Sequence, residues 1–165
     1  MEYMLGRFFP GFSGLALLVL VAGLGSTLTA QQVAAEASAS ELKVSCQSFT
    51  AERLAVWQKR LNLEEWNVTV AMTRAADLKP KTLGNIHWDL EKKTAVIRVL
   101  DPADYHMPLA DMLRDMEFTV VHELIHLGFA PVLADLQRTD ANRREEEHAV
   151  NHMADALLKL DRGGK

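Results

Sequence analysis

The feature that most restricts the fold is a segment that would form a helix apolar on almost every side. Residues 118–129 read Phe-Thr-Val-Val-His-Glu-Leu-Ile-His-Leu-Gly-Phe, and a helix of this composition must be covered by other elements over most of its surface. Its ionisable side chains, His122, Glu123 and His126, are costly to bury unless they find partners. The chain must therefore build a core around this helix and supply those partners.

Length and composition limit what that core can be. The sequence has 165 residues, of which 48% are hydrophobic, and this suits one domain with a real core. The net charge of -4 argues against a nucleic-acid-binding protein, which would need a basic face. The single cysteine, Cys46, excludes an internal disulfide and a multi-cysteine zinc ribbon.

Residues 1–30 are expected to lie outside this domain. The stretch 8–30 carries no charged residue, and the apolar run 14–24 within it is typical of a signal peptide. The uncharged stretch is also long enough to span a bilayer. We therefore expect an exported protein, periplasmic or secreted, whose N-terminus is either cleaved or kept as a membrane anchor. The alternative is a wrongly chosen start codon upstream of a cytosolic protein. Residues 31–49, rich in Ala, Ser and Gln, are expected to be a linker.

Residues 50–162 predict one α+β domain. Three segments with helical apolar spacing predict helices over 51–61, 109–127 and 143–160. Three β-rich segments predict strands over 66–72, 84–90 and 94–100. Thr50 is expected to cap the first helix, and Gly128 with Pro131 to end the second. The strands predict a small three-stranded sheet with an antiparallel edge strand, because the last two flank a short turn typical of a hairpin.

The spacing of the three ionisable groups indicates a metal site. Residues four apart on a helix lie above one another, with about 5–6 Å between their Cβ atoms. The imidazoles of His122 and His126 can therefore converge on one tetrahedral zinc ion, and Glu123 can accept a proton from the attacking water as general base. One zinc ion with its water would satisfy all three buried groups. Without a metal, the two histidines would need backbone carbonyls and Glu123 would need a nearby arginine.

A catalytic zinc needs a third protein ligand, and the last predicted helix offers one. Its apolar stripe, extended back by one turn, reaches the acidic run 145–147. Of these residues we favour Glu147, because Asn151 stands four residues later and could hold a zinc-binding histidine. Glu146 continues the same stripe and is the alternate, whereas Glu145 falls to one side.

These two motifs resemble the gluzincin clan of HExxH zinc metallopeptidases. In that clan a Glu on the helix after the active-site helix is the third ligand, with an Asp or Asn four residues later. His122-Glu-Leu-Ile-His126 and Glu147-His-Ala-Val-Asn151 match this pattern, although Asn replaces the commoner Asp. A metzincin would instead have a histidine six residues after His126, where this chain has Val132. The small size resembles the minimal gluzincins, and compact HExxH peptidases of phage, SprT-like and repressor-cleaving families are related.

The resemblance spans roughly residues 50–162 and implies a zincin-like fold with an N-terminal helix, a small sheet, an active-site helix and a C-terminal helix. It implies a zinc metalloendopeptidase with one Zn²⁺ per chain and a peptide or protein substrate. An edge strand would bind the extended substrate by strand addition, with Asn85 and His87 pairing with its backbone. Larger family members stabilise the oxyanion with a Tyr or His. The residues eligible for that role here are Tyr105, His106, His148 and His152.

Two other interpretations remain at this point. One is a zinc-binding but inactive or latent zincin-like domain that acts as a binding module, which the lack of an identified oxyanion residue favours. The other is a helical exported module without metal, in which the buried His and Glu side chains form ordinary core pairs.

Overall fold

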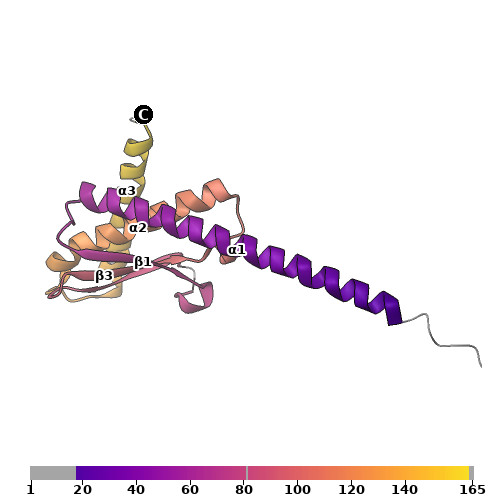
Figure 1. Cartoon of the computed structure of the whole chain (residues 1–165). Coiled ribbons are helices and arrows are strands. Elements are labelled where there is room, and N and C mark those ends of the chain that lie inside the picture. Colours follow the sequence, from indigo (N-terminus) through magenta and orange to yellow (C-terminus); the bar gives the residue numbers. More distant parts are fainter. Residues whose placement is uncertain (1–17, 81, 164–165) are drawn as a thin grey trace, which may run out of the picture. The chain divides into compact units, whose positions relative to one another are not determined.

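The computed structural model describes residues 18–80 and 82–163, with residues 18–30 as backbone only (Figure 1). The expected signal or anchor segment 1–30 therefore lies outside the described residues, apart from helical backbone from Leu18 onward. The chain divides into two compact units, residues 1–38 and 39–165. Helix α1 (Leu18–Arg60) runs through both, and every other element belongs to the second unit.

The second unit is an α+β fold built on a small mixed sheet. Its strands are β1 (Asn67–Thr73), β2 (Gly84–Asp89) and β3 (Thr94–Leu100), in the spatial order β1-β3-β2. Strand β3 runs parallel to β1 and antiparallel to β2, so β2 is an edge strand. The predicted α+β class and small three-stranded sheet with an antiparallel edge are confirmed.

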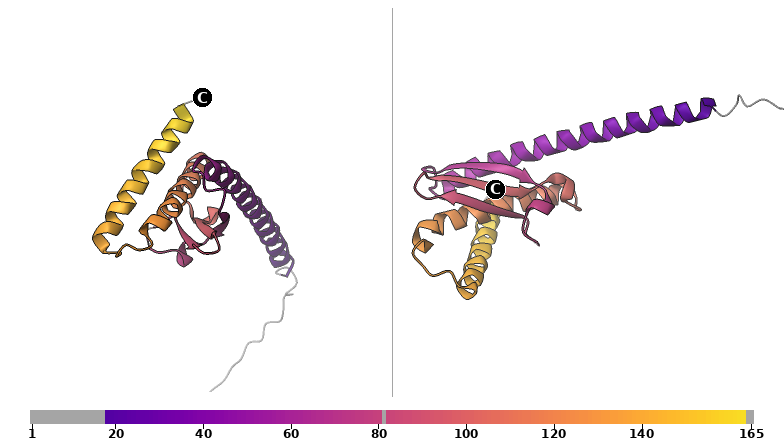
Figure 2. Two further views of the ribbon diagram at one scale, coloured as in Figure 1. Left: turned by 90° about the vertical axis from the view of Figure 1, so that its left-hand side faces the viewer. Right: turned by 90° about the horizontal axis from the view of Figure 1, so that it is seen from below.

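Two long helices follow the sheet. They are α2 (Leu109–Leu133) and α3 (Asp140–Gly163), and α2 contacts β2, β3 and α3. Helix α2 therefore lies between the sheet and α3 (Figure 2). It is also apolar and long enough to cross a membrane, but 61% of its most apolar window is buried inside the unit, as expected for a core helix.

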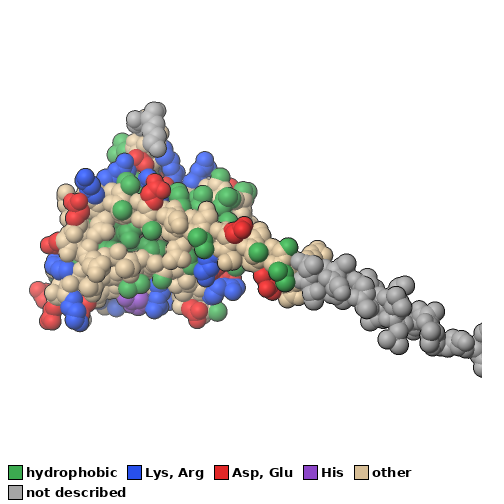
Figure 3. Space-filling model, viewed as in Figure 1, with side chains coloured by type: hydrophobic (Ala, Val, Ile, Leu, Met, Phe, Trp, Pro, Cys, Tyr) green, Lys and Arg blue, Asp and Glu red, His purple; other side chains and the backbone are tan. Residues whose placement is uncertain are grey.

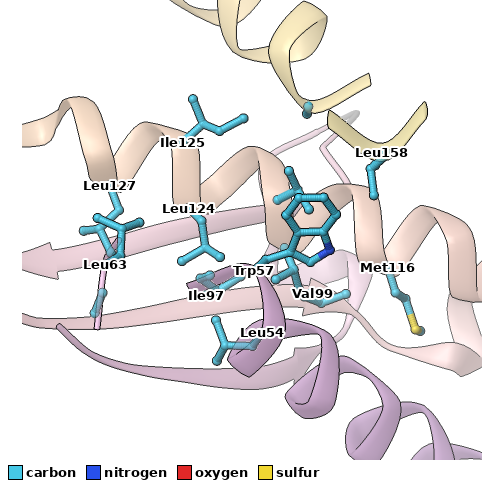
Figure 4. Packing of buried hydrophobic residues seen from close by; sticks show 14 of the residues in the cluster. Leu54, Trp57, Leu63, Ile97, Val99, Met116, Leu124, Ile125, Leu127 and Leu158 are labelled. Carbon is cyan, nitrogen blue, oxygen red and sulfur yellow. The ribbon is translucent and has the colours of Figure 1, made fainter. Parts of the chain in front are cut away.

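The core lies on one face of the sheet. Along β3, Ala95, Ile97 and Val99 are buried whereas Val96 is exposed, which is the alternation of a half-buried strand. Side chains from α1, β3, α2 and α3 meet on the buried face (Figure 4). Those labelled there include Leu54, Trp57, Ile97, Val99, Met116, Leu124 and Leu158. The face seen in Figure 3 carries interspersed acidic and basic side chains.

Helix α1 begins far before the predicted N-cap. The Ala-rich stretch expected to be a linker, 31–49, is helical, and Cys46 within it belongs to the core. Alanine is the strongest helix former, so this segment continues the helix without needing an apolar stripe. Thr50 does not cap a helix end. Its hydroxyl donates to the carbonyl of Cys46 one turn earlier at 2.6 Å.

The two later helices also extend past their predicted ends. Helix α2 continues through Gly128 and Pro131 to Leu133, because packing of this segment, including the buried Ala130, overrides the local helix-ending signals. Helix α3 begins at Asp140 rather than 143. Pro131 lies in the last turn of α2. Few helical hydrogen bonds lie beyond it, so the helix tolerates a proline there.

A buried ion network joins the three helices of the second unit. Glu117 on α2 is nearly buried, and its Oε1 accepts from Arg53 Nε at 2.6 Å and from Trp57 Nε1 at 2.9 Å, both on α1. Arg53 also contacts Asp161 on α3 at 3.1 Å. Because removing one partner would leave a buried charge uncompensated, this network fixes how the helices pack.

Candidate metal centre

The middle of α2 brings His122 and His126 together. Their Nε2 atoms lie 3.1 Å apart, with ring centroids 4.7 Å apart and planes at 70°. A potential ligand atom of Glu123 lies within 4.8 Å of those of both histidines. These three residues form a group that could hold a metal ion, and it contains the two histidines predicted from their spacing to converge on one ion.

Helix α3 brings two carboxylates to the same two imidazoles. One oxygen of Glu147 lies 3.4 Å from His122 Nε2, and its other oxygen lies 3.4 Å from His126 Nε2. Glu146 instead contacts the far nitrogen of His126, with Oε1 at 2.8 Å from Nδ1. The two candidates for a third ligand therefore take different positions. Glu147 faces the Nε2 atoms of both histidines, whereas Glu146 lies on the Nδ1 side of the His126 ring.

The contacts around His126 define which of its nitrogens is free to bind a metal. Glu146 is held by Arg138, whose guanidinium lies 2.6 Å from Glu146 Oε2. A carboxylate so paired with arginine accepts hydrogen bonds, so His126 Nδ1 carries the proton and donates to it. Nε2 of His126 then carries no proton, and its lone pair points toward His122 Nε2, where a metal ion could bind both nitrogens. Such a carboxylate behind a ligating histidine is the usual way of orienting the ring.

The other imidazole is less fully satisfied. His122 Nδ1 is buried and has no hydrogen-bond partner among the described residues. Burial, then the charge of His126, lowers the pKa of His122, while Glu147 and an interaction with Asn151 act in the opposite direction. Asn151 lines the same cleft. The structure thus brings the predicted Asn151 close to His122, but without a hydrogen bond to Nδ1.

Glu123 is a buried carboxyl without a cationic partner. Burial first, and then the negative charge of Glu147, raise its pKa to about 8. No lysine or arginine pairs with it in the part of the chain that the structure describes. The core-pair interpretation required an arginine beside Glu123, so this environment does not support it.

The group opens into a cleft of about 430 Å³. Its walls come from β2, from α2, from α3 and from the loop before β2. They include Lys79, Leu83, Gly84, Ile86, Trp88, Phe118, Thr119, Arg138 and Asn151, besides the two histidines and the three glutamates. At Gly84 the strand passes so close to α2 that an added Cβ would overlap Thr119 Cγ2 and lie 2.6 Å from the Arg98 carbonyl oxygen. Glycine here lets the edge strand approach the helix that carries the histidines.

The residues of β2 whose backbone groups face outward are shifted by one position from the residues predicted to do so. The amide of Leu100 donates to the carbonyl of Leu83, and the register pairs Gly84 with Val99. In an antiparallel pair, residues that bond the partner strand alternate with residues that do not. The backbone groups of Asn85 and His87 therefore face β3, and those of Gly84, Ile86 and Trp88 face outward. Asn85 and His87, the residues predicted to pair with a substrate backbone, therefore direct their backbone groups at β3, and Asn85 also lines the cleft.

The residues considered for oxyanion stabilisation do not line the cleft. The Tyr105 hydroxyl donates to Asp115 Oδ2 at 2.8 Å, and burial, then this contact, raise its pKa. His106 is exposed. His148 and His152 are exposed on α3 and contact each other.

Sequence reasoning missed Arg138 and the position of Glu146 behind His126. Arg138 lies in the α2–α3 connection, where no periodic pattern marks a residue. The only available signal was an arginine shortly before an acidic helix start. Comparisons with protein-family models, with curated proteins and with solved structures found no match to this chain.

Proposed function

We propose that this protein is a zinc-dependent metallopeptidase of zincin-like fold. The observation that carries the proposal is the convergence of His122 Nε2, His126 Nε2 and the Glu147 carboxylate, at 3.1 to 3.4 Å from one another, beside a buried Glu123 in a cleft. In this assignment His122, His126 and Glu147 hold the metal. Glu146 orients His126, with Arg138 behind it.

The donor set suits zinc. Zinc–nitrogen and zinc–oxygen distances of about 2.0–2.1 Å in a tetrahedron place neighbouring ligand atoms roughly 3.3 Å apart. The contacts among the three side chains fall close to that spacing. Two imidazoles and one carboxylate are also the ligand set of known catalytic zinc sites that keep a fourth position open. Imidazole with carboxylate is less suited to calcium or magnesium, which take oxygen ligands.

Each residue then has a separate task. A bound zinc ion would supply Lewis acidity, making water a nucleophile near neutral pH and polarising the scissile carbonyl. Glu123 lies beside the histidines without being needed as a ligand, so it accepts the proton of the attacking water. Burial and the charge of Glu147 raise its pKa to about 8 in the metal-free chain, and the positive charge of a bound zinc ion would favour the ionised carboxylate that accepts this proton and then passes it to the leaving amine.

The cleft suits an extended peptide. The outward backbone groups of Gly84, Ile86 and Trp88 offer hydrogen bonds to a substrate strand added at the edge of the sheet. The same residues line the cleft, which brings the substrate backbone beside His122 and Glu123. Export, with or without a membrane tether through residues 8–30, is part of the same proposal and rests on the uncharged N-terminal stretch.

Cleavage of an unstructured peptide library by the zinc-loaded chain tests this function. Wild type is expected to cleave, and Glu123→Gln is expected to keep zinc but lose cleavage by about 100-fold or more, since its amide cannot accept the proton. Glu145→Gln, on an exposed neighbour of the site, is the matched control and should cleave as wild type does. Equal cleavage by wild type and Glu123→Gln would refute the assigned role.

A second candidate is a zinc-binding domain that is inactive or latent and acts by binding. The position of Tyr105, held by Asp115 and absent from the cleft lining, favours it, because none of the described residues that line the cleft is a tyrosine or a third histidine that could stabilise a developing oxyanion. Zinc binding without cleavage of any library peptide, together with peptide capture in the cleft, would support this second candidate over the first.

A further inference from the structure

We propose that His148 and His152 on α3 form a second, surface site for a divalent transition-metal ion. The two residues are four apart on one helix, and their ring centroids lie 4.1 Å apart with planes at 62°. The pair in the candidate metal centre has a similar arrangement, at 4.7 Å and 70°. Two imidazoles so placed can bind one ion from successive turns of the helix.

The ring nitrogens of this pair are available. Both side chains are exposed, so binding an ion requires little desolvation. Neither imidazole makes a hydrogen bond or ion pair within the described parts of the chain, in contrast to His126, which is bonded to Glu146. Because no hydrogen bond has to be broken first, these ring nitrogens can bind an ion directly.

The proposed site is distinct from the candidate metal centre. His148 and His152 each follow a residue that faces the cleft, Glu147 and Asn151, and one residue along a helix turns the side chain by about 100°. Neither histidine lines the cleft. The site therefore does not depend on the proposed peptidase function, and it would remain if that function were wrong.

The neighbours of the pair include two carboxylates that could supply oxygen ligands. Glu145 precedes His148 by three residues and Asp155 follows His152 by three, so both carboxylates belong to the same helix stripe. Asp155 is paired with Lys159, and the exposed Arg144 stands four residues before His148, so the charges around the pair largely balance and the two imidazoles carry the site. Imidazole with oxygen ligands suits Cu²⁺, Ni²⁺ and Zn²⁺, and Cu²⁺ is expected to bind most tightly of the three.

Cu²⁺ held by iminodiacetate is the probe that separates the two sites. The chelator occupies part of the coordination shell and leaves positions for side chains, so the effect of the single substitutions on its affinity assigns the bound ion to one pair of histidines. Binding of this complex to the full chain, untagged, in detergent and above pH 7, is measured by titration calorimetry. His148→Ala and His152→Ala are each expected to lower the affinity about tenfold or more, because the second ligand of a linked pair binds at high effective concentration.

The control is His106→Ala, which removes one exposed histidine elsewhere in the unit and should leave the affinity unchanged. The complex should also raise the melting temperature of wild type but not of His152→Ala, since two-point binding requires a helical α3. The proposal is overturned if either single substitution lowers the affinity by clearly less than tenfold, or if His106→Ala lowers it equally. In those cases the histidines bind independently.

Discussion

Arg138 reaches a buried imidazole through one intervening carboxylate. The Arg138 side chain is 37% exposed, and its guanidinium lies 2.6 Å from Glu146. The Glu146 side chain is only 11% exposed and lies 2.8 Å from His126 Nδ1. A carboxylate this buried is costly without a cation. Arg138 therefore holds the Glu146 carboxylate in place, and Glu146 keeps the His126 lone pair directed at the metal position.

Arg138→Ala is expected to weaken zinc binding by about 10–100-fold, the usual effect of losing a partner behind a ligating histidine. Competition with a chromophoric chelator measures the zinc affinity. Arg143→Ala, on an exposed arginine in the first turns of α3, is the matched control and should bind as wild type does. Unchanged affinity in Arg138→Ala would show that His126 needs no support from the loop.

Glu123 makes the metal-free protein sensitive to pH. Its pKa in the folded chain is raised to about 8, mainly by burial, whereas in the unfolded chain it has its ordinary acidic value. The folded state therefore holds a proton that the unfolded state releases. The stability that this proton contributes is complete below the unfolded pKa and is lost as pH rises through about 8.

We expect the free energy of unfolding of chelator-treated wild type to fall relative to Glu123→Gln as pH rises from about 4 to about 8, because glutamine stays neutral in the same site. Denaturant titrations at successive pH values measure both proteins. Parallel pH profiles for the two chains would mean that Glu123 is not buried as described.

At the scale of elements, the approach of β2 to α2 depends on one glycine. A side chain at position 84 would overlap Thr119 and the backbone of Arg98, and a backbone cannot yield as a flexible side chain does. Gly84→Ala is expected to lower the free energy of unfolding by ~1–3 kcal/mol, as overpacking does, and to move the edge strand from the cleft. Chemical denaturation measures this loss.

Gly128→Ala is the control for that substitution. Nothing lies within 4 Å of a Cβ added at Gly128, and the residue is inside α2. Alanine there should raise the free energy of unfolding by about 0.5–1 kcal/mol through helix propensity. Two glycine substitutions of opposite sign would support the described packing, whereas stabilisation by Gly84→Ala would contradict it.

The packing of the three helices depends on Glu117. This carboxylate bonds Arg53 and Trp57 of α1, and Arg53 continues to Asp161 of α3. Glu117→Ala should lower the free energy of unfolding by ~3–5 kcal/mol, because it leaves a largely buried guanidinium short of its partner. Lys159→Ala, which breaks an exposed pair, should cost about 1 kcal/mol or less. Similar losses in both variants would mean that the Glu117 network is not buried.

At the scale of the whole molecule, local sequence patterns predicted the elements better than their ends. Alternation along 94–100 predicted β3 with the observed bounds, because one face of that strand is buried. Thr50 was misread because threonine bonds the carbonyl of Cys46 inside a helix as readily as it caps one. The helix-ending signals at Gly128 and Pro131 failed because packing of α2 outweighs them.

The part of the candidate site that lies on one helix was predictable from the sequence, whereas the contacts between different elements were not. His122, Glu123 and His126 lie within two turns of one helix, so their spacing alone brings them together. The separate positions of Glu146 and Glu147 depend on how α3 packs on α2, and the contact of Arg138 depends on the path of a connecting segment. Which residues of β2 direct their backbone groups outward depends on the hydrogen-bond register with β3. The alternation of side chains along β2 does not reveal that register.

The most direct test of the zinc site is the zinc content of the reconstituted chain, measured by mass spectrometry in wild type, Glu147→Gln and Glu145→Gln. After zinc bound at the exposed surface pair has been removed by dialysis against a weak chelator, we predict about one zinc per chain in wild type and in Glu145→Gln, and loss of zinc in Glu147→Gln, because Glu147 places a carboxylate oxygen 3.4 Å from each imidazole Nε2 atom. Wild type without zinc, or full zinc content in Glu147→Gln, would contradict the assignment.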